Sequence, residues 1–283
     1  MMILQTSPMQ TKWIYLSILP LLLIQCTRDD ITTLDTQTPV IEGYLIAGAP
    51  LDSVRITLSY SYARADTNLI TLDDLPVRVY SGDRETMLIP IGSGYYQDTT
   101  FIIEATHSYN IEFEWNGETI RAQTYVPEMK TAVISQDEIA VQQIAAGSFP
   151  NPGSIEVDPV EVTWDNTEGD YYYVVIENTA EDPEYINERF AEFENGNGGP
   201  GRFRMISRPQ ITDFYAINAF RDLTQFGLHR VVIFRVNPEY AALYELSSTS
   251  TQNITQPPTN VENGLGIWTG ISSDTVYLNV VKK

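Results

Sequence analysis

The chain has 283 residues, of which 43% are hydrophobic and 19% charged, a composition typical of a folded globular protein rather than a disordered one. Its 37 acidic residues outnumber 17 basic ones, and the resulting formal net charge of −20 argues against nucleic acid as a partner, because an acidic surface repels phosphate backbones. The single cysteine, Cys26, excludes a fold held together by disulfide bonds.

The N-terminus has the pattern of a secretory signal. Residues 13–24 are apolar except for Ser17 and Pro20, and Lys12 stands directly before them. This stretch is too short to span a bilayer, which takes roughly 20 residues. A basic residue followed by a short apolar stretch is typical of a signal peptide, so we predict that residues 1–25 are removed.

The apolar stretch ends in Leu23-Ile24-Gln25-Cys26, which resembles the lipobox of bacterial lipoproteins. Leu23 is the apolar residue that this motif has three positions before the cysteine, whereas Gln25 is larger than the usual small residue. The resemblance implies cleavage before Cys26 and acyl chains such as palmitate on it. Each buried CH₂ group adds about 0.8 kcal/mol to membrane attachment. The alternatives are a plain secretory signal and an uncleaved anchor.

Residues 26–38 are predicted to be a lipidated tether. Its segment Arg28-Asp29-Asp30, which follows the cysteine closely, resembles the surface-export signal of Bacteroidota lipoproteins. The alternative is a solvated linker, because the segment is rich in Thr, Asp and Gln.

Residues 39–127 are predicted to form an N-terminal β-sandwich domain. Alternating apolar and polar residues, or β-prone runs, predict strands at 40–46, 53–60, 76–80, 109–115 and 118–126. Asn116-Gly117, between the last two, is the strongest short signal for a β-hairpin. Short strands separated by turn residues favour an immunoglobulin or fibronectin III-like sandwich.

Residues 128–283 are predicted to form a second β-rich domain. Its predicted strands are 160–164, 171–177, 202–207, 230–236 and 275–281. Trp164 faces the same way as Val160 and Val162 and is assigned to the core. The run 230–236 is almost continuously apolar, which predicts a strand buried on both faces.

Two short helices are predicted in this second half. Residues 181–193 have a modest helical pattern. A second helix is expected after Asn237, which serves as N-cap, with Pro238 at the first helical position. Helical spacing then places Tyr240 and Tyr244 on one face.

The residues of familiar catalytic and metal sites are missing or scattered. His107 and His229 are the only histidines, and neither has a second His or a Cys at zinc-ligand spacing, so we predict ordinary sheet or loop positions for both. The chain lacks the Gly-x-Ser-x-Gly elbow of many hydrolases. The glycine-rich loop 195–201 lacks the Lys-Ser/Thr ending of a phosphate-binding loop.

Acidic residues offer one further candidate. The turn that follows Trp164 contains Asp165, Asn166, Glu168 and Asp170. Oxygen ligands of this kind bind Ca²⁺, but in a chain with 37 acids a solvated turn is the favoured interpretation. We therefore predict no catalytic residue, no metal site and no cofactor, and a non-enzymatic protein.

Several segments recur in the order and spacing of one protein family. Besides Cys26 they are residues 40–45, 94–96, 125–127, 237–240 and 260–268. Together they resemble the Bacteroidota lipoprotein family called domain of unknown function 4249, across nearly the whole mature chain. The most specific piece is Gly-Leu-Gly-Ile-Trp at 264–268, where family members commonly end in Phe. The resemblance implies a surface or periplasmic lipoprotein, often encoded beside a TonB-dependent outer-membrane transporter, and supplies no catalytic residues.

We accordingly expect a lipid-anchored outer-membrane protein on the cell surface, or alternatively on the periplasmic face, that assists a TonB-dependent transporter in nutrient capture. Contact candidates are the loop 195–201, Tyr215 and Phe220. The alternative is a carbohydrate-binding or adhesion module, which two or three exposed Tyr or Trp rings on one sheet would indicate. A hydrolase would require a deep pocket with paired carboxylates or a Ser–His contact.

Overall fold

The computed structural model describes residues 37–59, 69–148, 158–190, 204–246 and 258–283. Within these ranges, no helix combines the length and the apolar character that a membrane crossing requires. Several predicted features lie outside the described residues: the signal peptide 1–25, Cys26, the segment 28–30 and the loop 195–201.

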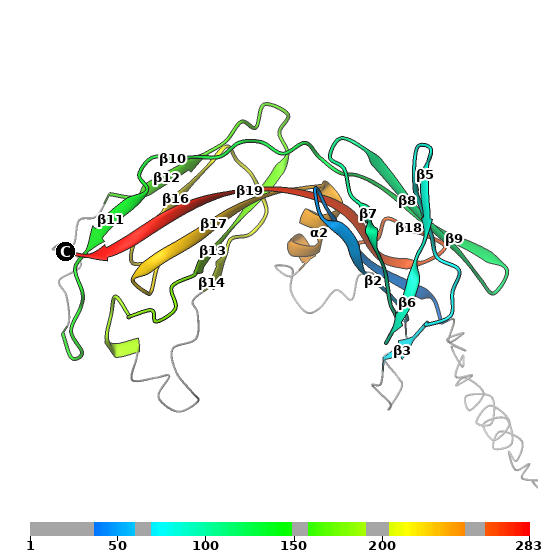
Figure 1. The fold of residues 1–283 in the computed structure, drawn as a ribbon, viewed down its shortest axis with the longest axis horizontal. Coiled ribbons are helices and arrows are strands. Elements are labelled where there is room, and N and C mark those ends of the chain that lie inside the picture. The colour runs from blue at the N-terminus through cyan, green and yellow to red at the C-terminus, as the bar shows by residue number, and fades with distance from the viewer. Residues whose placement is uncertain (1–36, 60–68, 149–157, 191–203, 247–257) are drawn as a thin grey trace, which may run out of the picture. The chain divides into compact units, whose positions relative to one another are not determined.

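The described chain is built almost entirely from β-strands, which confirms the predicted all-β sandwich class (Figure 1). The largest sheet has eleven strands, with the central order β14-β13-β17-β19-β1-β2-β7-β6. Its members are β1 (Pro39–Ile46), β2 (Pro50–Leu58), β3 (Ile70–Thr71), β6 (Ile89–Gly92), β7 (Tyr95–Ile102), β11 (Glu138–Val141), β13 (Tyr171–Asn178), β14 (Arg204–Ile206), β15 (Gln210–Ile211), β17 (Gly227–Val236) and β19 (Leu265–Lys282).

Two smaller sheets complete the sandwiches. The five-stranded sheet has the order β18-β9-β8-β4-β5 and the three-stranded sheet the order β10-β12-β16. Their strands are β4 (Arg78–Ser81), β5 (Arg84–Met87), β8 (Ser108–Trp115), β9 (Glu118–Tyr125), β18 (Val261–Glu262), β10 (Val133–Ile134), β12 (Val160–Thr163) and β16 (Phe214–Ile217).

The last strand, β19, joins the two sandwiches. It is 18 residues long, and its first part pairs in parallel with β1, from Val40 opposite Leu265 onwards. Its later part pairs antiparallel with β17 and parallel with β11. The sequence predicted only a closing strand at 275–281, whereas in the structure this strand already begins at Leu265.

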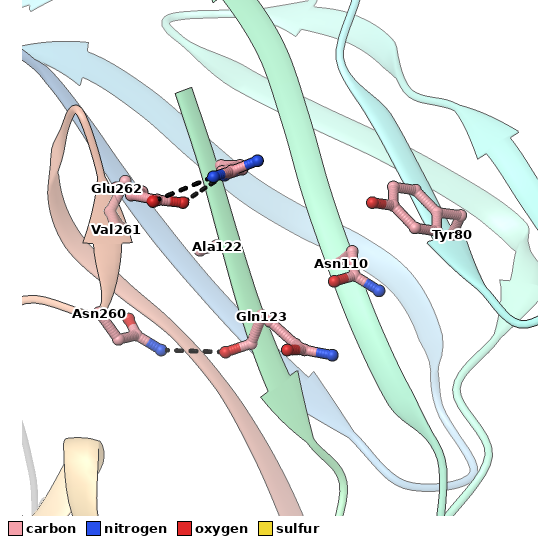
Figure 2. Close-up of a pocket in the computed structure, with 8 residues that line it drawn as sticks. Tyr80, Asn110, Ala122, Gln123, Asn260, Val261 and Glu262 are labelled. Carbon is pink, nitrogen blue, oxygen red and sulfur yellow. Dashed lines mark hydrogen bonds and ion pairs between the residues drawn. The ribbon is translucent and has the colours of Figure 1, made fainter. Parts of the chain in front are cut away.

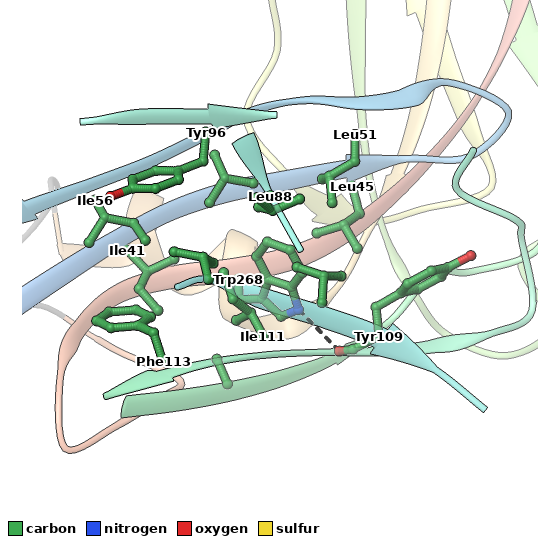
Figure 3. Close-up of a cluster of buried hydrophobic side chains, with 14 of the residues drawn as sticks. Ile41, Leu45, Leu51, Ile56, Leu88, Tyr96, Tyr109, Ile111, Phe113 and Trp268 are labelled. Atoms are coloured by element: carbon green, nitrogen blue, oxygen red, sulfur yellow. Dashed lines mark hydrogen bonds between the residues drawn. The ribbon is translucent and has the colours of Figure 1, made fainter. Parts of the chain in front are cut away.

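The first hydrophobic core lies between the five-stranded sheet and the β1, β2 and β7 part of the large sheet (Figure 3). Trp268 is fully buried at its centre, and its indole Nε1 donates a hydrogen bond to the Tyr109 carbonyl at 3.0 Å. Gly43 is opposite Trp268 in the β1–β19 register, and a Cβ atom there would overlap the indole ring. Gly43 therefore makes the space that the indole fills.

The second core lies between the three-stranded sheet and strands β13, β17 and the end of β19. Trp164 is 6% exposed in this core, as predicted, and its indole Nε1 donates to the Thr212 carbonyl at 2.9 Å. From Val231 to Val236, β17 is buried or half-buried on both faces, which confirms that prediction except at the exposed Arg230. Val231 and Ile233 face the second core, while Phe234 on the opposite face stacks on Tyr173.

The two cores do not follow the predicted domains 39–127 and 128–283. Val261 and Trp268, from the C-terminal range, are buried in the first core. They belong there because β18 pairs with β9 and the first part of β19 pairs with β1. Residues 37–283 accordingly cluster as one compact unit.

One predicted helix is confirmed, and the start of the other is corrected. Helix α2 (Pro238–Leu246) begins where expected, with the Asn237 carbonyl accepting hydrogen bonds from the amides of Tyr240 and Ala241. By contrast, the helix predicted over 181–193 is helical, among the described residues, only at 189 and 190, whereas residues 181–188 form bends, a turn and isolated bridges. Pro183 lacks an amide donor, and the Ile186 amide binds the Thr224 carbonyl instead of a preceding turn.

Candidate functional site

A polar groove of ≈ 560 Å³ lies on the outer face of the five-stranded sheet (Figure 2). It draws on β4, β8, β9 and β18. The groove is lined by Tyr80, Asn110, Arg121, Ala122, Gln123, Asn260, Val261 and Glu262.

Strand alternation determines which side chains face the groove. Ile111 and Ala122 point inward and are buried in the first core, so their neighbours Asn110 and Gln123 point outward. The register places Tyr80 opposite Asn110, and Asn110 opposite Gln123. The result is a row of three polar side chains across three adjacent strands, visible in Figure 2.

Asn110 and Gln123 form what we call the amide pair. Within the described part of the chain, neither side-chain amide has a hydrogen-bond partner. Asn260 differs, because its Oδ1 accepts from the Trp268 amide at 3.0 Å and its Nδ2 donates to the Trp268 carbonyl at 2.7 Å. Asn260 therefore fastens its segment to β19, while the amide pair keeps its hydrogen-bonding capacity.

A row of alternating charges lies beside the amide pair. The register places Arg78 opposite Glu112, Glu112 opposite Arg121, and Arg121 opposite Glu262. Arg78 Nη1 lies 2.8 Å from Glu112 Oε1, and Arg121 holds both carboxylate oxygens of Glu262. The hydrogen bond between Arg121 and Glu262 raises the pKa of the guanidinium and lowers that of the carboxyl. Each of the two arginines therefore already has a carboxylate partner.

A tyrosine pocket of ≈ 650 Å³ lies on the outer face of the large sheet, beside α2. Its lining consists of Tyr44, Ile46, Tyr173, Phe234, Tyr240, Leu243, Tyr244 and Ile271.

The rings of this pocket are packed mainly on one another. Tyr173 stacks on Phe234 with centroids 4.7 Å apart and on Tyr240 at 5.6 Å. The Tyr240 and Tyr244 hydroxyls lie 3.2 Å apart, as expected for two tyrosines on one helix face. Burial raises the pKa of Tyr173 and Tyr240, so both phenols stay neutral at ordinary pH. We interpret the pocket as the aromatic contact that holds α2 on the sheet.

The turn considered as a Ca²⁺ site contains Asp165, Asn166, Glu168 and Asp170. Lys130 Nζ lies 3.6 Å from Asp165 Oδ2 and 3.2 Å from Glu168 Oε1, and Arg235 pairs with Asp170. The chain's own cations thus occupy these oxygens. Among the residues that the structure describes, no group of three His, Cys, Asp or Glu side chains is placed to hold a metal ion.

The two histidines are not brought together. His229 lies in β17, fully buried, with Nδ1 3.0 Å from the Gly227 carbonyl, and desolvation lowers its pKa. His107 precedes β8, is exposed, and has Nδ1 2.9 Å from the Ala105 carbonyl. Each side chain binds the carbonyl two residues before it, as an ordinary strand or loop histidine does.

The predicted contact aromatics differ in exposure. Phe220 is 40% exposed, whereas Tyr215 is half-buried and packs against the second core. Sequence reasoning missed Tyr80 and the amide pair Asn110 and Gln123. The sequence did contain a signal for the amide pair. The Asn116-Gly117 turn sets the register of the hairpin, and this register places the two amides opposite each other.

No family model matches the chain, and no curated protein matches it. Among solved structures, the chain is similar to one titled "Anomalous substructure of Titin-A168169", with 10% sequence identity, a TM-score of 0.21, and coverage of 86% of this chain and 98% of that one. A likeness at this TM-score is too slight to inform on function.

Proposed function

We propose that this protein is a non-enzymatic lipoprotein of the bacterial outer membrane that assists a TonB-dependent transporter in nutrient capture. Acyl chains on Cys26 anchor it, and its β-sandwich body faces the cell surface. The anchoring rests on one observation: the apolar stretch 13–24 is followed, after Gln25, by Cys26, the chain's single cysteine. The resemblance to domain of unknown function 4249 supports the surface address and the transporter as partner.

The polar groove supports a binding role. Its one arginine, Arg121, pairs with its one glutamate, Glu262, and its free polar groups are the neutral amides of Asn110 and Gln123. Amides hold a ligand by hydrogen bonds, whereas general acid–base catalysis needs a group that exchanges a proton near the working pH. The groove is therefore better suited to recognition than to proton transfer.

The anchoring is tested by fractionating cells and measuring the mass of the native product. We expect an N-terminal acylated cysteine at position 26 and a protein in the outer-membrane fraction. Cys26→Ala should abolish acylation and leave the outer membrane without mature protein, whereas the control Ser17→Ala, a small change inside the apolar stretch, should behave like the wild type. A native product with an unmodified thiol at position 26, or with a start upstream of it, contradicts the anchor.

The partnership and the orientation need separate measurements. A tagged lipoprotein, solubilised with its membrane, should co-purify with a TonB-dependent transporter, and recovery without any transporter contradicts the accessory role. Protease treatment of intact cells should digest a surface-exposed body. Resistance until the outer membrane is permeabilised supports the periplasmic face instead.

A further inference from the structure

We propose that the polar groove binds a neutral saccharide, with Asn110 and Gln123 as the hydrogen-bonding pair and with Tyr80 and Tyr125 as flanking rings. This inference rests on the proposed nutrient-capture function and names its ligand class. It assigns the recognition to the outer face of the five-stranded sheet.

The amide pair has the chemistry that sugar hydroxyls require. Each hydroxyl both donates and accepts a hydrogen bond, and a carboxamide offers two N–H donors beside a carbonyl acceptor. Asn110 and Gln123 lie directly opposite each other on β8 and β9, so neighbouring hydroxyls of one ring meet both groups. Both amides face the groove on the same side of the sheet in Figure 2, next to Tyr80.

Two tyrosines share this face with the amide pair. Tyr80 lies across β4–β8 from Asn110, and the Arg78 guanidinium sits 4.7 Å from its ring centroid. Tyr125 follows Gln123 by two residues on β9, which puts it on the same face, and it is 46% exposed. An aromatic ring offers an apolar surface for the C–H face of a sugar and a hydroxyl at its rim.

Charge selects a neutral ligand over an anionic one. Arg78 is paired with Glu85 and Glu112, and Arg121 is paired with Glu262, so an incoming phosphate or carboxylate would have to compete with a carboxylate already bound to each guanidinium. These five side chains carry two positive and three negative charges, and the whole chain is acidic with a net charge of −20. An anion entering the groove would be repelled, whereas a neutral polyol is not.

The tyrosine pocket is less suited to a saccharide. The Tyr240 and Tyr244 hydroxyls already lie within hydrogen-bond distance of each other, and apart from the hydroxyls of Tyr44 and Tyr173 the rest of the lining is apolar. Sugar hydroxyls buried there without partners would lose their hydrogen bonds to water. The polar groove is therefore the surface that we assign to the saccharide.

The test uses the full mature lipoprotein in lauryldimethylamine oxide, a detergent without a sugar headgroup. It is applied to an array of neutral oligosaccharides, namely maltohexaose, cellohexaose, xylohexaose, mannohexaose and laminarihexaose, with a heparin oligosaccharide as the anionic probe. We expect binding to at least one neutral oligosaccharide and none to heparin. Absence of binding to every neutral probe, or preference for heparin, overturns the inference.

Variants then locate the binding. The double variant Asn110→Ala/Gln123→Ala should weaken binding about tenfold or more, because it removes the hydrogen-bonding groups of both residues. Tyr125→Ala should weaken it too, and Tyr125→Phe should weaken it less because the ring remains. Gln97→Ala, a half-buried amide on β7 of the other sheet, is the matched control and should bind like the wild type. Wild-type affinity in the double variant overturns the assignment.

Separate measurements distinguish a loss of folding from a loss of binding, and the saccharide assignment from the accessory role. The amide pair has no partner among the described residues, so the double variant should keep the wild-type circular dichroism and melting temperature. Co-purification with a transporter does not require the groove. Glycan binding without co-purification therefore contradicts only the accessory role, and co-purification without glycan binding contradicts only the saccharide assignment.

Discussion

At the scale of single residues, the first core depends on a matched pair of side chains on neighbouring strands. Gly43 on β1 faces Trp268 on β19, and any Cβ at position 43 would overlap the six-membered part of the indole. Trp268 is fully buried, and its Nε1 satisfies the Tyr109 carbonyl. The large indole of Trp268 therefore fits only because Gly43 has no side chain.

Gly43→Ala should lower the free energy of unfolding by about 1–3 kcal/mol, because it overpacks the core. Trp268→Phe should also destabilise, because it leaves a cavity and an unpaired carbonyl. Together the two changes should cost less than their sum, since Phe lacks the ring atoms that collide with a Cβ at position 43. Urea unfolding of the four proteins of this cycle measures the coupling, and additive costs would contradict the matched pair.

At the scale of elements, the β8–β9 hairpin connects a local turn to the groove. Asn116 and Gly117 have φ values of 52° and 85°, the left-handed pair of a type I′ turn. From this turn the register runs through Glu112 opposite Arg121 to Asn110 opposite Gln123. The alignment of the amide pair is thus set by two turn residues at the far end of the hairpin.

Gly117→Val should destabilise the protein by about 1–2 kcal/mol or more, because a β-branched residue resists a positive φ. Saccharide binding should fall with it if the turn adjusts and the hairpin shifts its register. Asn116→Gly is the matched control, since glycine adopts this conformation freely. Thermal melts of both variants give the comparison, and equal melting temperatures would show that the turn does not hold the register.

At the scale of the whole molecule, β19 belongs to both sandwiches. Trp268 near its start is buried in the first core, and Leu278 and Val280 near its end are buried in the second. One continuous strand that is hydrogen-bonded to β1 and then to β17 predicts that the two cores unfold together.

Ile111→Ala, a change confined to the first core, should therefore speed amide hydrogen exchange in the second. Ile111 is fully buried, and its loss should cost about 2–5 kcal/mol. Exchange followed by mass spectrometry should show the same acceleration in peptides of β8 and of β17. Acceleration in β8 peptides alone would mean that the sandwiches unfold independently.

Local sequence patterns were sufficient wherever a short stretch of chain decides its own structure. Four features were predicted in this way: the Asn116-Gly117 turn, the N-cap before α2, the inward face of Trp164, and the burial of both strand faces over 230–236 except at Arg230. From the turn alone, the amide pair could also have been derived, because a two-residue hairpin fixes which residues lie opposite each other. The alternation of apolar and polar residues shows which face of a strand is buried, and it can be read from the strand's own sequence.

Only the tertiary structure decided which strands meet across long stretches of chain. The alternation of apolar and polar residues along a strand does not show which strand lies beside it. The parallel pairing of β1 with β19 and the burial of Val261 and Trp268 in the first core were therefore not predictable. The same holds for Tyr80, whose strand could have joined any edge. It also holds for residues 181–188, where contacts with distant backbone replaced the first part of the expected helix. The physical reason is that these pairings depend on packing between segments far apart in sequence, which no local pattern encodes.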